Sequence, residues 1–190
     1  MKHSSFLPLA VVLLSLLLVS MACNLFAKSE PTPAATIPVS TQAVESLEKN
    51  LQQAGTAISS SGQTTLTINE EQLTSLVASE LQKQETPIFR DPQVYLRDGQ
   101  IKILGKVQQG DAEATLELVL TVSVNSDGRP GYKLVSAKIG PLPLPDAMVQ
   151  GLSDQLDSAF KSNIDPQMDD IYIDKITIAD GVMTIQGHKR

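Results

Sequence analysis

One stretch of the sequence, Ala112–Asn125, alternates between apolar and polar residues almost throughout. A period of two places one set of side chains on each face of a β-strand. At ~3.3 Å per residue this strand is on the order of 40 Å long, which exceeds the usual strand. A strand of this length with one apolar face must be covered, so the rest of the chain has to supply its cover. The apolar set is Ala112, Ala114, Leu116, Leu118, Leu120, Val122 and Val124.

The first residues have the pattern of a bacterial export signal. A basic residue near the start is followed by the apolar run Leu7–Val19 and by small residues before Cys23. This order is typical of a cleaved signal peptide. The cysteine after a small residue resembles the lipobox of bacterial lipoproteins, with Ser20 where Leu or Val is usual. The resemblance implies that residues 1–22 are a lipoprotein signal peptide and that Cys23 is lipidated.

The alternative for the same residues is an uncleaved membrane helix over Phe6–Leu25. The apolar run is shorter than the ~20 residues that span a bilayer, unless Met21–Phe26 extends it. Both interpretations predict an extracytoplasmic chain anchored to the bacterial cell membrane, or to an outer membrane where one exists. The chain has one cysteine, which favours lipidation, because a secreted domain built on disulfides carries an even number.

The charge of the chain argues against several classes of partner. Its formal net charge is −6 and its basic residues are scattered, so we expect no nucleic-acid partner. Net charge would not attract it to anionic lipid head groups either. It has no tryptophan and few other aromatic residues, which argues against a stacking platform for sugars or bases.

Composition divides the chain into three parts. Behind the signal peptide, residues 23–40 comprise the candidate lipidated cysteine and a stretch of Pro, Ser, Thr and Ala. This composition favours a flexible, extended tether. Residues 41–190 carry periodic apolar patterns and predict a single folded domain.

Helices and strands alternate within the predicted domain. Asn69 and Gln72 have the spacing of a capping box, and Asp98-Gly99 predicts a tight hairpin. The order of elements predicts an α+β fold, with a long, curved, mostly antiparallel sheet of about six to seven strands wrapped around one or more amphipathic helices. The predicted helices are Thr41–Ala54, ended by Gly55, then Glu70–Gln84, and a third that starts at Pro145 or Asp146 and runs to about Asn163. The predicted strands are Thr64–Ile68, Gln93–Arg97, Gln100–Gln108, Ala112–Asn125, Tyr132–Ile139, Asp170–Ile178 and Val182–Gly187.

Two local irregularities are expected. Three prolines at alternate positions in Gly140–Pro145 exclude a central strand and favour an extended connector. In the strand 170–178 the isoleucines change parity, so a bulge near Asp174-Lys175 is needed to return them to one face.

Three segments carry a resemblance to a known family: Leu66–Leu73, Val94–Ile101 and Gly140–Pro145. They resemble the YpmS-like and LmeA-like small envelope proteins, many of them membrane-anchored, over roughly Thr64–Arg190. The resemblance implies a curved antiparallel sheet around a helix, like one half of the tubular lipid-binding fold, and some relatives bind phospholipid. It supplies no catalytic residues.

The apolar face of the long strand raises a binding hypothesis. With neighbouring apolar residues it can line a groove for an acyl chain, because aliphatic and Met side chains leave an adaptable apolar surface. The alternative is an ordinary filled core, as aliphatic stripes usually form. The candidate ligand-binding residues are Ile103, Leu116, Leu118, Leu120, Val122, Leu134, Leu142, Leu144, Met148, Leu152, Leu156 and Phe160.

Residues for catalysis or metal binding are scarce. Behind the signal peptide the only histidine is His188, so neither a Ser-His-Asp triad nor a His/Cys zinc site is expected. The acidic cluster in 165–174 lacks the spacing of a calcium loop. We therefore expect a protein that is not an enzyme, with no catalytic residues, no metal and no cofactor.

Together these patterns favour a membrane-anchored lipoprotein that binds a lipid or another hydrophobic envelope molecule in an apolar groove. Its expected partners are the membrane, through the lipid anchor at Cys23, and a lipid ligand. The alternative is a non-enzymatic structural or adaptor lipoprotein with a solid core.

Overall fold

The computed structural model describes residues 36–83, 89–109, 112–163 and 170–190. The predicted signal peptide and Cys23 lie outside the described residues. Thr36–Arg190 form one compact unit, which supplies all the members of both hydrophobic clusters described below. Its elements are α2 (Thr41–Ser61), β1 (Gln63–Asn69), α3 (Glu70–Gln82), β2 (Phe89–Arg97), β3 (Gln100–Gln109), β4 (Ala112–Val124), β5 (Pro130–Ile139), β6 (Leu142–Pro143), α4 (Asp146–Asn163), β7 (Ile171–Ala179) and β8 (Val182–Lys189).

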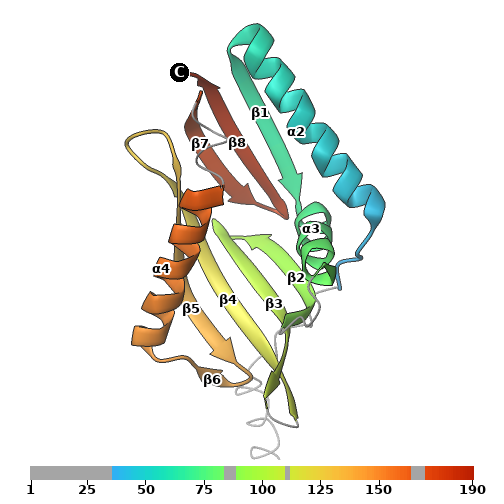
Figure 1. The fold of residues 1–190 in the computed structure, drawn as a ribbon, viewed down its shortest axis with the longest axis vertical. Helices are drawn as coiled ribbons and strands as arrows, with labels where there is room; N and C mark the ends of the chain where they lie inside the picture. Colours follow the sequence, from blue (N-terminus) through green and yellow to red (C-terminus); the bar gives the residue numbers. More distant parts are fainter. Residues whose placement is uncertain (1–35, 84–88, 110–111, 164–169) are drawn as a thin grey trace, which may run out of the picture. The chain divides into compact units, whose positions relative to one another are not determined.

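The strands form two antiparallel sheets (Figure 1), one of three strands in the order β1-β8-β7 and one of five in the order β2-β3-β4-β5-β6. The predicted α+β class with antiparallel pairing is confirmed. The strands are divided between two sheets rather than continuous in one. Two contacts account for this division. Helix α3 packs against β2, and β1 pairs with β8, near the end of the chain, rather than with a strand of the five-stranded sheet.

The helix ends follow local capping rules. Asn69 and Gln72 form the predicted capping box at the start of α3. The prediction that Gly55 ends α2 is wrong, because the helix continues to Ser61 and ends at Gly62, whose φ is 74°. Burial of Ile58 holds the extra turns in place, and serine hydroxyls there hydrogen-bond to carbonyls one turn earlier.

The register of the hairpins agrees with the sequence pattern. Asp98 and Gly99 both have positive φ in the turn between β2 and β3, as a two-residue hairpin loop requires. A register shift between Ile173 and Lys175 confirms the predicted bulge in β7. In the proline-rich stretch, Leu142–Pro143 pairs only with the end of β5 at the margin of the sheet.

Two hydrophobic clusters hold the unit together. The first joins the two sheets and α2, with Leu47, Leu96 and Ile178 among its buried members. The second lies between the five-stranded sheet and α4, around Leu120 and Leu134. Ile101 packs against both clusters, so the core is continuous along β3.

Candidate functional site

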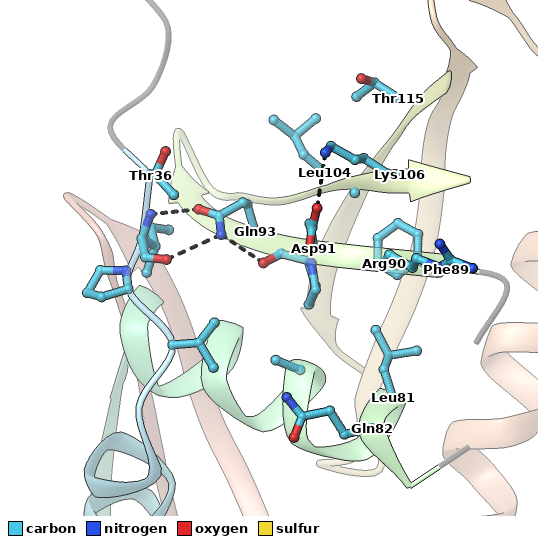
Figure 2. Close-up of a pocket in the computed structure, with 16 residues that line it drawn as sticks. Thr36, Leu81, Gln82, Phe89, Arg90, Asp91, Gln93, Leu104, Lys106 and Thr115 are labelled. Atoms are coloured by element: carbon cyan, nitrogen blue, oxygen red, sulfur yellow. Dashed lines mark hydrogen bonds and ion pairs between the residues drawn. The ribbon is translucent and has the colours of Figure 1, made fainter. Parts of the chain in front are cut away.

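A cleft of about 840 Å³, open to solvent, lies where the start of the compact unit meets α3, β2 and β3 (Figure 2). Its volume is within the range of small-molecule binding sites, ≈ 300–1,000 Å³. Its lining is mostly apolar and the charged groups are grouped on the β-strands. The lining residues are Thr36, Ile37, Pro38, Val39, Ala78, Leu81, Gln82, Phe89, Arg90, Asp91, Pro92, Gln93, Leu104, Gly105, Lys106 and Thr115.

The first wall is the extended segment Thr36–Val39, which the side chain of Gln93 holds (Figure 2). The backbone N–H of Ile37 donates to Oε1 of Gln93 at 2.6 Å, and Nε2 of Gln93 donates to the carbonyl oxygen of Ile37 at 3.2 Å. A side-chain amide has the donor and acceptor of a peptide group, so Gln93 pairs with Ile37 as a neighbouring strand would. Ile37 is 8% exposed, which anchors the segment by apolar burial as well.

The second wall is the C-terminal part of α3, which contributes Ala78 and Leu81. Side chains of the same helix accept hydrogen bonds from the backbone of β2. Oγ1 of Thr74 accepts from the N–H of Val94 at 2.9 Å, and Oε1 of Glu70 accepts from the N–H of Leu96 at 2.7 Å. These bonds hold the N-terminal half of α3 against β2, one or more turns before the wall residues Ala78 and Leu81.

The third wall is the irregular start of β2. The register with β3 shifts between Arg90 and Gln93, and Asp91 has a φ of 48°. The bulge includes Pro92, which has no N–H to offer a partner strand. The ring of Phe89 lies against Gly105, where an added Cβ would collide with it. Glycine at this position of β3 is therefore what leaves room for the ring.

Charged groups of β2, β3 and β4 gather beside the cleft. The ammonium of Lys106 lies 3.1 Å from Asp91 and 3.4 Å from Glu113. The hydrogen bonds to Asp91 and Glu113 raise the pKa of Lys106 above its ordinary value. The arrangement combines an apolar interior with charges at the strands, which suits a ligand that has an apolar body and a polar end.

The residues that the sequence singled out for ligand binding do not line this cleft. Ile103, Leu118 and Leu144 pack against the buried Leu120 and Leu134 in the second cluster. Leu116 and Val122 are half-buried on β4, whereas Leu142, Met148 and Leu152 are exposed. The side chains of Leu156 and Phe160 lie outside the described part. A ligand-binding role for these residues stays a prediction.

The sequence did not predict the cleft, because the residues that line it do not recur at the regular spacing of one helix or strand. Leu104 follows Ile103 directly, so it lies on the opposite face of the sheet from the predicted apolar stripe. The other apolar residues come from a segment predicted as tether, from one end of a helix and from the start of β2. Two signals were present: the apolar pair Ile37 and Val39 within a polar stretch, and Pro92 directly before the predicted strand Gln93–Arg97.

His188 takes part in a separate cluster at the end of β8. Its Nδ1 lies 2.9 Å from Oδ1 of Asp174, and its ring stacks on Tyr172. Nε of Arg190 donates to the carbonyl oxygen of Ile171 at 2.9 Å. These contacts join the last residues to β7, and they account for Asp174 within the acidic stretch; Asp165 and Asp169 lie outside the described residues.

In the part of the chain that the structure describes, no three His, Cys, Asp or Glu side chains are grouped as metal ligands. None of the described helices is both long and apolar enough to cross a membrane. No protein-family model matches the sequence. No curated protein matches it either.

Proposed function

We propose that this chain is an extracytoplasmic lipoprotein, anchored to the membrane through Cys23, that binds a lipid or another hydrophobic envelope molecule in the cleft beside Thr36–Val39. The observation that carries the proposal is the apolar lining of that cleft, to which Ile37, Leu81 and Leu104 contribute. Burial of aliphatic groups there supplies about 0.8 kcal/mol per methylene, so affinity is expected to rise with the length of an acyl chain.

The position of the cleft in the chain supports the same proposal. Thr36 lines the cleft, and residues 24–35 separate it from Cys23. The 13 residue steps from Cys23 to Thr36 reach at most about 45 Å, at 3.3–3.6 Å per residue. Lipidation of Cys23 would therefore keep the cleft within about 45 Å of the bilayer, where hydrophobic envelope molecules are concentrated.

Probe binding to a fragment of residues 24–190 tests the cleft. The fragment contains the whole compact unit. N-phenyl-1-naphthylamine fluorescence should rise on binding, and palmitate should displace the probe. Leu81→Glu places a charge in the apolar wall and should weaken probe binding tenfold or more, which corresponds to about 1.4 kcal/mol.

Leu51→Glu is the matched control, because Leu51 is exposed on α2 and does not line the cleft. It should bind the probe as the unmodified fragment does. A fragment that binds no probe, or equal binding by the Leu81→Glu variant, would overturn the proposed site.

Lipidation has a separate test. The full chain, expressed in bacteria with radiolabelled palmitate, should incorporate label, and Cys23→Ser should abolish the incorporation. Unchanged labelling of the Cys23→Ser variant would refute the anchor.

A structural or adaptor lipoprotein is the second candidate, and exposed apolar side chains near α4 favour it. Leu142 and Met148 are 69% and 56% exposed, as expected of a surface that binds another protein. An adaptor would bind no apolar probe, and Leu142→Ser with Met148→Gln would weaken its complex with a purified partner. Probe binding that Leu81→Glu abolishes favours the lipid-binding function instead.

A further inference from the structure

We infer that Gln93 is a positioning residue that couples occupancy of the cleft to docking of the segment Thr36–Val39. This inference rests on the proposed function. The segment forms one wall of the cleft and continues toward Cys23, so whatever displaces the segment also dismantles the binding site.

The contacts of the segment make Gln93 its main polar attachment. Both backbone groups of Ile37 bond to the amide of Gln93, at 2.6 and 3.2 Å. Nε2 of Gln93 also donates to the carbonyl oxygen of Pro92, at 2.9 Å. That contact ties the amide to the bulge of β2 and fixes its orientation. The polar attachment of this wall therefore depends on one side chain that the sheet itself positions.

The start of α2 is attached independently of Gln93. The backbone N–H of Ser40 donates to Oγ of Ser75 at 3.1 Å, and Oγ of Ser40 donates to Oε1 of Glu71 at 3.2 Å. These bonds hold the start of α2 on α3. Release of Thr36–Val39 can therefore stop at Ser40, with α2, α3 and the sheet still in place. The segment itself belongs to no helix or strand, so its release breaks no ladder of hydrogen bonds.

By thermodynamic linkage, docking of the segment and binding of an occupant affect each other reciprocally. If docking of the segment raises the affinity for an occupant by some factor, the occupant stabilises docking by the same factor. An occupant that contacts Ile37 and Val39 supplies such a differential interaction. Tension on the chain between Cys23 and Thr36 would oppose docking and so favour release of the occupant.

Two variants of the fragment of residues 24–190 test the positioning role. Gln93→Leu keeps a similar volume but removes both bonds to Ile37, and it should weaken binding of N-phenyl-1-naphthylamine fivefold or more. Gln93→Glu keeps an acceptor for the Ile37 N–H but places a carboxylate oxygen against the carbonyl oxygens of Ile37 and Pro92, so it should weaken probe binding at least as much as Gln93→Leu does. Gln100→Leu, on exposed Gln100 of the neighbouring strand and outside the cleft lining, should leave probe affinity unchanged.

Hydrogen exchange gives a readout that needs no variant. In the unmodified fragment a saturating concentration of the probe should slow exchange of the Ile37 amide about fivefold or more. This factor should be similar to the loss of probe affinity in the Gln93→Leu variant, because the coupling is reciprocal. In that variant the same amide should exchange faster without the probe. A merely structural role for Gln93 would change stability without linking the two measurements.

The two proposals fail in different ways. An unmodified fragment that binds no probe overturns the proposed function. A fragment that binds the probe, while Gln93→Leu binds equally well or the Ile37 amide exchanges at the same rate with and without the probe, overturns the coupling and leaves the proposed function standing.

Discussion

Thr74 and Val94 meet at the margin of the five-stranded sheet, where Oγ1 of the threonine accepts the backbone N–H of the valine at 2.9 Å. The opposite margin has the same device, because Oγ of Ser153 in α4 accepts the N–H of Leu134 in β5 at 3.1 Å. Thr74 is 0% and Ser153 8% exposed. Hydroxyl groups of the helices thus accept hydrogen bonds from backbone N–H groups at the margins of the sheet. Left unpaired, such N–H groups could pair with the strand of another molecule.

Thr74→Val should lower the free energy of unfolding by about 1–3 kcal/mol, because it leaves the Val94 N–H buried without its acceptor. Thr74→Ser keeps the hydroxyl and loses one methyl group, so it should cost only about 1 kcal/mol. Urea denaturation followed by circular dichroism measures both. A valine variant as stable as the serine variant would contradict a role for this hydrogen bond.

Ser153→Ala should lower the free energy of unfolding by about 1 kcal/mol. Loss of the acceptor for Leu134 outweighs the better helix propensity of alanine, which is worth roughly 0.5 kcal/mol. Ser59→Ala is the control, because the Ser59 hydroxyl is exposed and bonds only within α2. The control should stay within about 0.5 kcal/mol of the unmodified protein in the same denaturation experiment. Equal effects of the two substitutions would argue against the capping of β5.

Gly105→Ala should reshape the cleft, because the new Cβ would collide with the Phe89 ring and lie 2.9 Å from the carbonyl oxygen of Arg90. Overpacking of this kind costs about 1–3 kcal/mol, and displacement of the ring should weaken binding of the apolar probe. Denaturation and probe titration measure the two effects.

A double-mutant cycle isolates the collision with the ring. In a Phe89→Ala background, Gly105→Ala should cost less than it does alone. Gly151→Ala is the matched control, since a Cβ there meets nothing within 4 Å, and alanine should stabilise α4 by up to about 1 kcal/mol. Equal costs of Gly105→Ala in both backgrounds would show that the ring is not the obstacle.

Glu117 should make stability depend on acid pH. Burial raises the pKa of this carboxyl, but hydrogen bonds and charges from Lys102 and Lys138 outweigh burial and hold the pKa below 4.5, its ordinary value. Because the folded-state pKa is depressed, the stabilisation is present above about pH 4.5 and is lost as pH falls through the folded-state value.

The measurement compares the unmodified protein with Glu117→Gln from pH 7 to pH 3. At pH 7 the variant should be less stable by on the order of 1 kcal/mol or less, and the difference should shrink below about pH 4.5. Glu48→Gln, on the exposed surface of α2, controls for the loss of one carboxylate. A difference that grows as pH falls would reverse the assigned sign.

Local patterns predicted most of the individual elements. Alternation located β4, Asp98-Gly99 located the hairpin between β2 and β3, and the change of parity in β7 located its bulge. Such features depend on residues close together in the chain. The end of α2 was misplaced because Gly55 breaks the local pattern, whereas burial of Ile58 by the rest of the protein carries the helix to Ser61.

The cleft was beyond local patterns for the same reason. Ile37 and Gln93 are 56 positions apart in the sequence, and neither residue alone indicates that their amides pair. The bulge at Pro92 gives the start of β2 a different register with β3 from that of the regular strand after it. A hydrophobic stripe can be recognised from the spacing of residues in the sequence. A concave surface depends on where distant segments of the chain leave space between them.

The sequence by itself determined the α+β class, the antiparallel hairpins and most helix boundaries, because backbone geometry converts short periods, caps and turn residues directly into elements. Only the tertiary structure decided that the strands divide into two sheets, that Thr74 and Ser153 close the margins of one of them, and that the apolar cleft lies beside Gln93 rather than along the stripe of β4. Those outcomes depend on packing between distant segments, where a single hydrogen bond or proline changes which surfaces meet.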